Sequence, residues 1–165
     1  MTDIDKFLDM NIFEGKHFDI IAQEMKWQYD YVRELDSNSK GQRRAIAVVI
    51  KKCTSERQKG FGTKRAFYDW YLTQPKQCHY CESREEDLLK MFQQKIFDPK
   101  KTAWKNGTLQ IEKKDPSLGY NPDNCVLTCV HCNNAKSDII SYDDWKEFFN
   151  APMKQFLASK LKEIK

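Results

Sequence analysis

Two pairs of cysteines have the spacing of a tetrahedral metal site. Cys78 and Cys81 form one CxxC pair, Cys129 and Cys132 form a second, and 47 residues separate the pairs. A CxxC turn places its two sulfurs within about 4 Å of each other, and two such turns can surround one Zn²⁺ with Zn–S distances of about 2.3 Å. A redox dithiol needs only one pair and normally opens a helix after a strand, a pattern that does not surround Cys78. The four cysteines therefore predict one structural zinc ion per chain.

The remaining cysteines are predicted to be small core residues. Cys53 lies on the apolar face of a predicted helix and Cys125 lies in a predicted strand. The N-terminal residues lack the basic and apolar regions of a secretory signal, and no stretch approaches the roughly 20 apolar residues of a membrane span. We therefore expect a soluble, cytoplasmic protein, a location in which disulfides are rare.

Composition and charge restrict the class of protein further. The chain has 165 residues, of which 40% are hydrophobic and 32% are charged, so it can bury a core and is not a disordered chain. The net charge is +4, but residues 1–39 sum to −5 and residues 40–80 to +8. Concentrated positive charge is typical of nucleic-acid binders. A solvated, lysine-rich helix face is the alternative.

The elements that must position these residues follow from the apolar spacing. Helical periodicity covers residues 16–35 and 42–55, and a third helix should follow Thr63 and stop before Pro75. A short helix is predicted over 83–95, a loop over 98–107, and strands over 108–113 and 124–128. Helices should then follow the second CxxC from Asn133, start near Ser141, and start again at Pro152. The predicted fold class is α+β and mainly helical.

Between and after the cysteine pairs, the letters themselves match a known pattern. The matching segments are Leu109–Asp115 (LQIEKKD), Gly119-Tyr120, Asn124 and Cys129–Ser137 (CVHCNNAKS). Together they resemble the HNH (ββα-metal) endonuclease family, in its branch of restriction enzymes. The resemblance covers about residues 63–142. It implies an HNH nuclease domain over 61–150 with a four-cysteine zinc site. Residues 1–60 lie outside the resemblance, and apolar spacing predicts that they form a helical N-terminal extension and that residues 151–165 form a C-terminal helix.

The resemblance also implies roles for single residues. Glu112 and Asn133 match the positions that bind a catalytic divalent cation, Mg²⁺ or Mn²⁺, and oxygen donors suit both ions. Asn124 matches a structural asparagine that holds the loop between the strands. Tyr120 matches a tyrosine near the attacking water or the phosphate.

Two positions depart from the family pattern. Lys113 stands where the family has His or Arg, and a lysine that is protonated at neutral pH stabilises phosphate charge rather than accepting a proton. Gln77 stands where the restriction branch has His. Three residues are therefore candidates for the general base: Tyr120, His79 and His131. Tyr120 is favoured, with His79 as a supporting acid or base.

What these matches imply is a metal-dependent endonuclease that hydrolyses DNA phosphodiester bonds, in restriction or antiphage defence. A catalytically weak zinc-knuckle module that binds nucleic acid or protein is the alternative, and RNA is a second possible substrate. The N-terminal helices, which the resemblance does not cover, would form a homodimer, cover the basic cleft or dock on a larger effector protein. The side chains predicted to contact double-stranded DNA are Arg43, Arg44, Lys51, Lys52, Lys59, Lys64, Arg65, Lys100 and Lys101.

Overall fold

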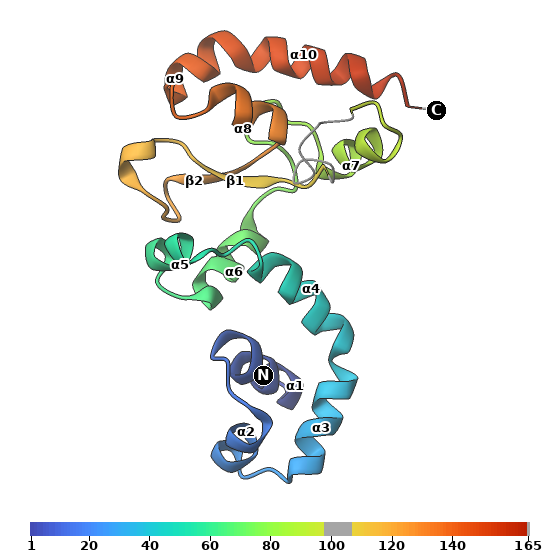
Figure 1. Cartoon of the computed structure of the whole chain (residues 1–165), viewed down its shortest axis with the longest axis vertical. Coiled ribbons are helices and arrows are strands. Elements are labelled where there is room, and N and C mark those ends of the chain that lie inside the picture. The colour runs from blue at the N-terminus through green and yellow to red at the C-terminus, as the bar shows by residue number, and fades with distance from the viewer. Residues whose placement is uncertain (98–106, 165) are drawn as a thin grey trace. The chain divides into compact units, whose positions relative to one another are not determined.

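The chain forms two compact units, Met1–Leu72 and Thr73–Lys165. The computed structural model describes residues 1–97 and 107–164 (Figure 1). The predicted loop over 98–107 lies almost wholly outside the described residues. The mainly helical α+β class predicted from the sequence is confirmed, with helices at the N-terminus and a β-hairpin followed by a helix later in the chain. No helix within the described ranges is both long enough and apolar enough to cross a membrane.

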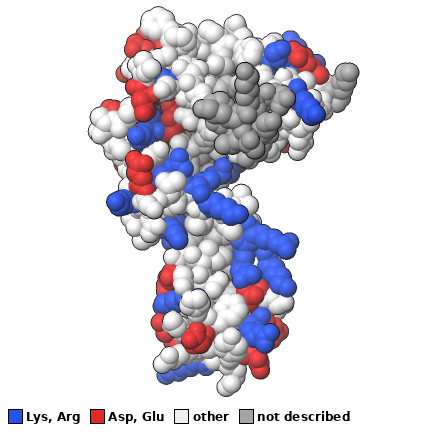
Figure 2. All heavy atoms as spheres, in the orientation of Figure 1, with Lys and Arg blue, Asp and Glu red and all other residues white. Residues whose placement is uncertain are grey.

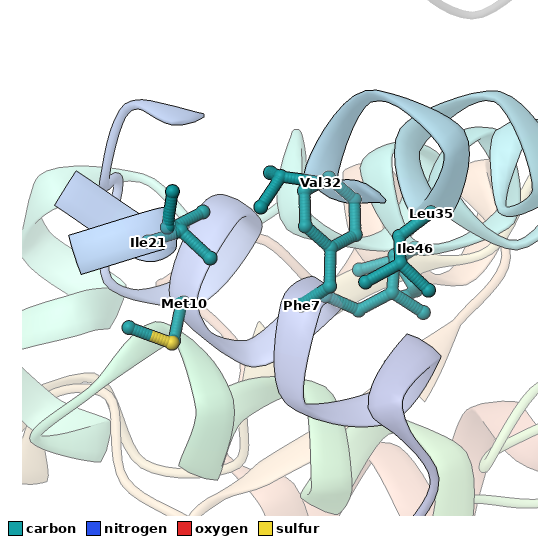
Figure 3. Packing of buried hydrophobic residues seen from close by; sticks show 8 residues of the cluster. Phe7, Met10, Ile21, Val32, Leu35 and Ile46 are labelled. Atoms are coloured by element: carbon teal, nitrogen blue, oxygen red, sulfur yellow. The ribbon is translucent and has the colours of Figure 1, made fainter. Parts of the chain in front are cut away.

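The first unit is built from helices alone. The residues buried at its centre are Phe7, Leu8, Met10, Ile21, Ala22, Val32, Leu35 and Ile46, and Figure 3 shows this cluster with six of the side chains labelled. Each of these side chains except that of Ala22 contributes roughly 1.5–3 kcal/mol when fully buried. The elements of this unit are α1 (Asp3–Leu8), a π-helical turn η1 (Asp9–Phe13), α2 (Phe18–Met25), α3 (Tyr29–Asn38), α4 (Lys40–Ile50), α5 (Ser55–Phe61) and α6 (Lys64–Thr73).

The single helix predicted over 16–35 is wrong, because the chain breaks it into α2 and α3. Lys26 adopts a left-handed conformation with φ of 55°. The N–H of Trp27 donates to the carbonyl of Ala22 at 2.9 Å, and that of Lys26 donates to Gln23 at 3.3 Å. These two bonds form the Schellman ending of a helix, which usually uses glycine. A lysine gives no such signal in the sequence, and the apolar period continues across the break.

The second unit holds the β-hairpin. β1 (Gln110–Lys113) pairs antiparallel with β2 (Cys125–Thr128), and Glu112 lies opposite Val126. The predicted order of strand, loop, strand and helix is confirmed. A short 3₁₀ turn, η3 (Pro116–Leu118), lies in the loop between the strands. The helices of this unit are α7 (Glu85–Gln93), α8 (Val130–Lys136), α9 (Tyr142–Asp144), the π-helical turn η4 (Trp145–Phe149) and α10 (Asn150–Leu161).

The prediction that the last helix begins at Pro152 is wrong. Helical backbone runs without interruption from Tyr142 to Leu161, and Pro152 is the third residue of α10. A proline lacks an N–H but is tolerated in the first turn of a helix, where that N–H has no partner to lose. Here the π-helical turn ends at Phe149, so the proline sits at the start of a new hydrogen-bonding pattern. The expected start at Ser141 is correct, since its side chain accepts from the N–H of Asp144 at 3.1 Å.

Candidate functional site

The four cysteines predicted as zinc ligands come together in the second unit. Their sulfur atoms all lie within 4.8 Å of one another, and all four residues are buried. The sulfurs of Cys81 and Cys129 are 3.7 Å apart. A tetrahedral zinc with Zn–S distances of about 2.3 Å needs sulfurs about 3.8 Å apart. The cluster therefore fits one structural Zn²⁺.

Local backbone bonds form the first of the two cysteine turns. The N–H of Glu82 donates to the carbonyl of Cys78 at 2.9 Å, and the N–H of Cys78 donates to Ser83 at 2.9 Å. Glu82 has a φ of 60°, which closes the turn. The N–H of His79 donates to Leu127 in β2 at 2.8 Å, so this turn is attached to the hairpin as well as to the other cysteines.

The second turn is the start of α8. Cys129 is the N-cap residue, and its sulfur accepts from the N–H of Cys132 at 3.4 Å. Helix N-termini stabilise thiolates, which are the metal-binding form of cysteine. Hydrogen bonds from the other three cysteines lower the pKa of Cys78, and the hydroxyl of Thr128 lies 3.6 Å from its sulfur.

Glu112 lies beside this cluster in a buried ion pair. Its side chain is 7% exposed, and one of its oxygens, Oε1, is 3.0 Å from the ammonium of Lys136, which is fully buried. The hydroxyl of Tyr80 donates to the same oxygen at 3.3 Å. The second oxygen, Oε2, is buried and has no hydrogen-bond partner among the described residues. Burial raises the pKa of Glu112 to about 7, although the bond and the charge of Lys136 oppose this rise.

Strand and helix periodicity explain this pairing. Gln110 and Glu112 lie on the same face of β1, and Asn133 and Lys136 lie one turn apart on the face of α8 that packs against β1. The amide of Asn133 donates to the side-chain oxygen of Gln110 at 2.6 Å. Gln110 thus pairs with Asn133 as Glu112 pairs with Lys136. No hydrogen bond joins Asn133 to Glu112 within the described chain, so the two predicted cation ligands share one layer but have different partners.

Lys113 and Tyr120, both predicted to be catalytic, form a separate pair. The ammonium of Lys113 lies 5.1 Å from the ring centroid of Tyr120. Because successive side chains of a strand point to opposite faces, Lys113 faces away from the layer that holds Glu112. The structure therefore separates Lys113 and Tyr120 from Glu112 and Asn133.

The two candidate histidines have different surroundings. His79 is exposed, and its Nε2 lies 2.9 Å from the hydroxyl of Tyr142. Desolvation by the surrounding groups is the main cause of its lowered pKa. His131 packs against Phe97, with ring centroids 4.4 Å apart, and against Phe92. Burial also lowers the pKa of His131, and its Nδ1 has no hydrogen-bond partner in the part of the chain that the structure describes.

Asn124 connects the two ends of the hairpin loop. Its amide nitrogen donates to the carbonyls of Asp115 at 2.8 Å and Gly119 at 2.7 Å. Its side-chain oxygen accepts from the N–H of Asp115 at 3.0 Å. These three hydrogen bonds of the buried Asn124 side chain therefore hold the loop in one conformation.

Most of the predicted DNA contacts lie in the first unit. Figure 2 shows Lys and Arg side chains gathered over the α4 region. Arg43 pairs with Asp36, and Arg65 pairs with Asp9 and Asp69. Lys100 and Lys101 lie outside the described residues. The positions of the others are Arg44 in α4, Lys51 and Lys52 after it, Lys59 in α5 and Lys64 in α6.

Sequence reasoning gave no role to several residues of the site. Lys136 is three residues after Asn133 on the same helix, and Gln110 is two residues before Glu112 on the same strand face. This periodicity was a usable signal for both residues. Tyr80 and Tyr142 gave no comparable signal, because their contacts join segments that are far apart in the sequence.

Comparison with known proteins adds no closer assignment: no family model, no curated protein and no solved structure matches this chain. The buried four-cysteine cluster and the hairpin followed by a helix are consistent with a ββα-metal-like arrangement.

Proposed function

We propose that this chain is a metal-dependent endonuclease of the HNH type, which hydrolyses DNA phosphodiester bonds and carries a structural zinc ion. The observation that carries the proposal is the carboxylate of Glu112. Its Oε2 is buried without a partner among the described residues, in the layer between β1 and α8 that also contains Asn133. An oxygen that has lost its water and has no partner is costly unless a ligand satisfies it.

The residues of this layer fit a hard divalent cation such as Mg²⁺ or Mn²⁺. Glu112 would offer Oε2, since Lys136 and Tyr80 engage only Oε1. Asn133 would offer its side-chain oxygen, because its nitrogen donates to Gln110. When bound, such a cation supplies charge stabilisation for the phosphate and the leaving oxygen. Lys136 and Gln110 would then hold the two ligand side chains in place.

Nicking of supercoiled plasmid in Mg²⁺ or Mn²⁺ tests the proposal. Glu112→Gln removes the charge but keeps the shape of the side chain, so we expect loss of nicking while zinc content is unchanged. Glu147→Gln is the matched control, because Glu147 is an exposed residue of η4 in the same unit. Equal nicking by the wild type and Glu112→Gln would overturn the proposal.

A second candidate function is a zinc-knuckle module that binds nucleic acid without cutting it. The Glu112–Lys136 pair favours this alternative, because a neighbouring ammonium already compensates the carboxylate. In addition, Lys113 stands at the position where many HNH enzymes have a histidine as general base, and a lysine that is protonated at neutral pH does not accept a proton. Tight binding of duplex DNA without any nicking in either metal would support this module and exclude the endonuclease.

A further inference from the structure

Two lysine side chains and one histidine side chain surround the ring of Tyr142. The ammonium of Lys146 lies 5.2 Å from the ring centroid of Tyr142, and that of Lys114 lies 6.0 Å from it. The ring of His79 stacks on Tyr142 with centroids 5.8 Å apart, and its Nε2 lies 2.9 Å from the tyrosine hydroxyl. These groups come from the first cysteine turn, the end of β1 and η4, so the fold itself gathers them.

The two lysines of this group differ from other lysines of the second unit in their ion pairing. Neither Lys114 nor Lys146 forms an ion pair within the described residues, whereas Lys154 pairs with Glu82 and Lys160 pairs with Glu163. The carboxylate that follows Lys114, Asp115, accepts from the N–H and the hydroxyl of Ser117 at 2.8 and 2.7 Å. A phosphate close to either ammonium group would be attracted by its charge.

The space beside Tyr142 is large enough for a piece of a polynucleotide. A cavity of about 490 Å³ is bordered by Tyr142 and by Lys114, and Leu118, which is 64% exposed, gives it a further apolar wall. The other residues that line this cavity belong to the hairpin loop and are Asp115, Asn121, Asp123 and Asn124. Its volume lies in the range of about 300–1,000 Å³ that is usual for ligand sites.

The group is connected to the proposed catalytic layer. Lys114 follows Glu112 by two residues, and its N–H donates to the carbonyl of Asn124 at 2.8 Å, which continues the strand pairing. Tyr80 donates to Glu112 and packs against Tyr142, with ring centroids 6.1 Å apart. Tyr80 therefore contacts both Glu112 and the group around Tyr142.

We propose that Lys114, Lys146 and His79, arranged around Tyr142, bind backbone phosphates of the DNA strand that is presented to Glu112. This inference rests on the proposed action on DNA, and none of these lysines belongs to the set predicted from the sequence. Lysine ammonium groups bind phosphate as point charges and release counterions, which gives the binding a measurable salt dependence.

The test is the salt dependence of duplex binding, measured by anisotropy of a fluorescein-labelled DNA duplex at several salt concentrations. Each phosphate contact contributes about 0.9 to the slope of log K against log salt. We expect the double variant Lys114→Ala/Lys146→Ala to reduce the magnitude of this slope by about 1.8, which is two contacts. The double variant Lys154→Ala/Lys160→Ala removes the same charge from ion-paired positions and should leave the slope unchanged.

Equal slopes for the two double variants would overturn the inference. Plasmid nicking, measured on the same proteins, distinguishes failure of the proposed phosphate site from failure of the proposed endonuclease function. If the wild type nicks DNA and the slopes are equal, the phosphate site is wrong and the endonuclease stands. If the wild type never nicks but the slope falls by two contacts, the endonuclease is wrong and the phosphate site stands. Tyr142→Phe, which keeps the ring between the lysines, should retain the wild-type slope.

Discussion

At the scale of single residues, Glu112 and Lys136 form a buried ion pair in the second unit. Both side chains are buried, so each depends on the other for compensation of its charge. Removal of one partner of a buried ion pair leaves an uncompensated charge, which typically costs about 3–5 kcal/mol. Replacement of both partners by apolar residues of similar size costs much less.

We therefore predict that Lys136→Met lowers the free energy of unfolding by roughly 3–5 kcal/mol. The double variant Glu112→Leu/Lys136→Met should recover most of this loss, because no charge remains buried. Urea denaturation of the zinc-loaded proteins measures both values. Strictly additive losses in the double variant would show that the two side chains do not interact.

Asn124 gives a second prediction at this scale. Asn124→Ala removes two donors and one acceptor from backbone groups of the hairpin loop. Buried groups left without a partner cost roughly 1–3 kcal/mol each, and the loop can expose some of them to water, so we expect a total loss of about 2–3 kcal/mol. The control is Asn134→Ala. Asn134 is an exposed residue of α8, and its side chain donates a single hydrogen bond, to the carbonyl of Val130. Equal unfolding midpoints for the two variants would contradict this role of Asn124.

At the scale of elements, the cysteine cluster joins the first CxxC turn, β2 and the start of α8. We predict one zinc per chain by mass spectrometry of metals, and its loss in Cys129→Ser. Cys125→Ser is the matched control, because Cys125 is also buried, in β2, but is not part of the cluster. Zinc retained in Cys129→Ser, or lost in Cys125→Ser, would disprove this ligand set. Since structural zinc sites supply folding free energy directly, Cys129→Ser should also lose the ordered hairpin.

Comparison with the sequence analysis shows where local patterns suffice. The spacing within each cysteine pair, the two short strand-like runs and the cap at Ser141 predicted the cysteine turns, the two strands and the start of α9, because each depends on residues close in sequence. The left-handed Lys26 could not be predicted in this way, and the periodicity that places Lys136 on the same helix face as Asn133 does not by itself identify Glu112 as its partner. Lys26 stands where glycine is usual, and the contact between Lys136 and Glu112 depends on how α8 packs against β1.

At the scale of the whole molecule, each unit has a hydrophobic core of its own. The eight-residue core described above lies wholly within Met1–Leu72, which contains none of the four clustered cysteines. The second unit combines its own buried side chains, Trp145, Leu88, Met91 and Leu157 among them, with the cysteine cluster. The two cores therefore depend on metal to different degrees.

We predict that removal of zinc by a strong chelator affects the two units unequally. Amide hydrogen exchange should speed up in β1, β2 and α8, whereas α3 and α4 should keep their protection. Exchange followed by mass spectrometry, with and without the chelator, measures this difference. A uniform rise across both units would mean that the first core does not persist without the metal.

The position of the cysteines along the chain has a consequence for biosynthesis. During translation the nascent chain emerges from its N-terminal end, and domains generally fold as units in that order. Residues 1–72 can bury their core before Cys129 and Cys132 have been made. Cys78 and Cys81 then wait until 47 more residues have been added before their partners exist. During that interval the two thiols are open to oxidation or to capture of a wrong metal, so the yield of correctly assembled protein should depend on the reducing state of the cell.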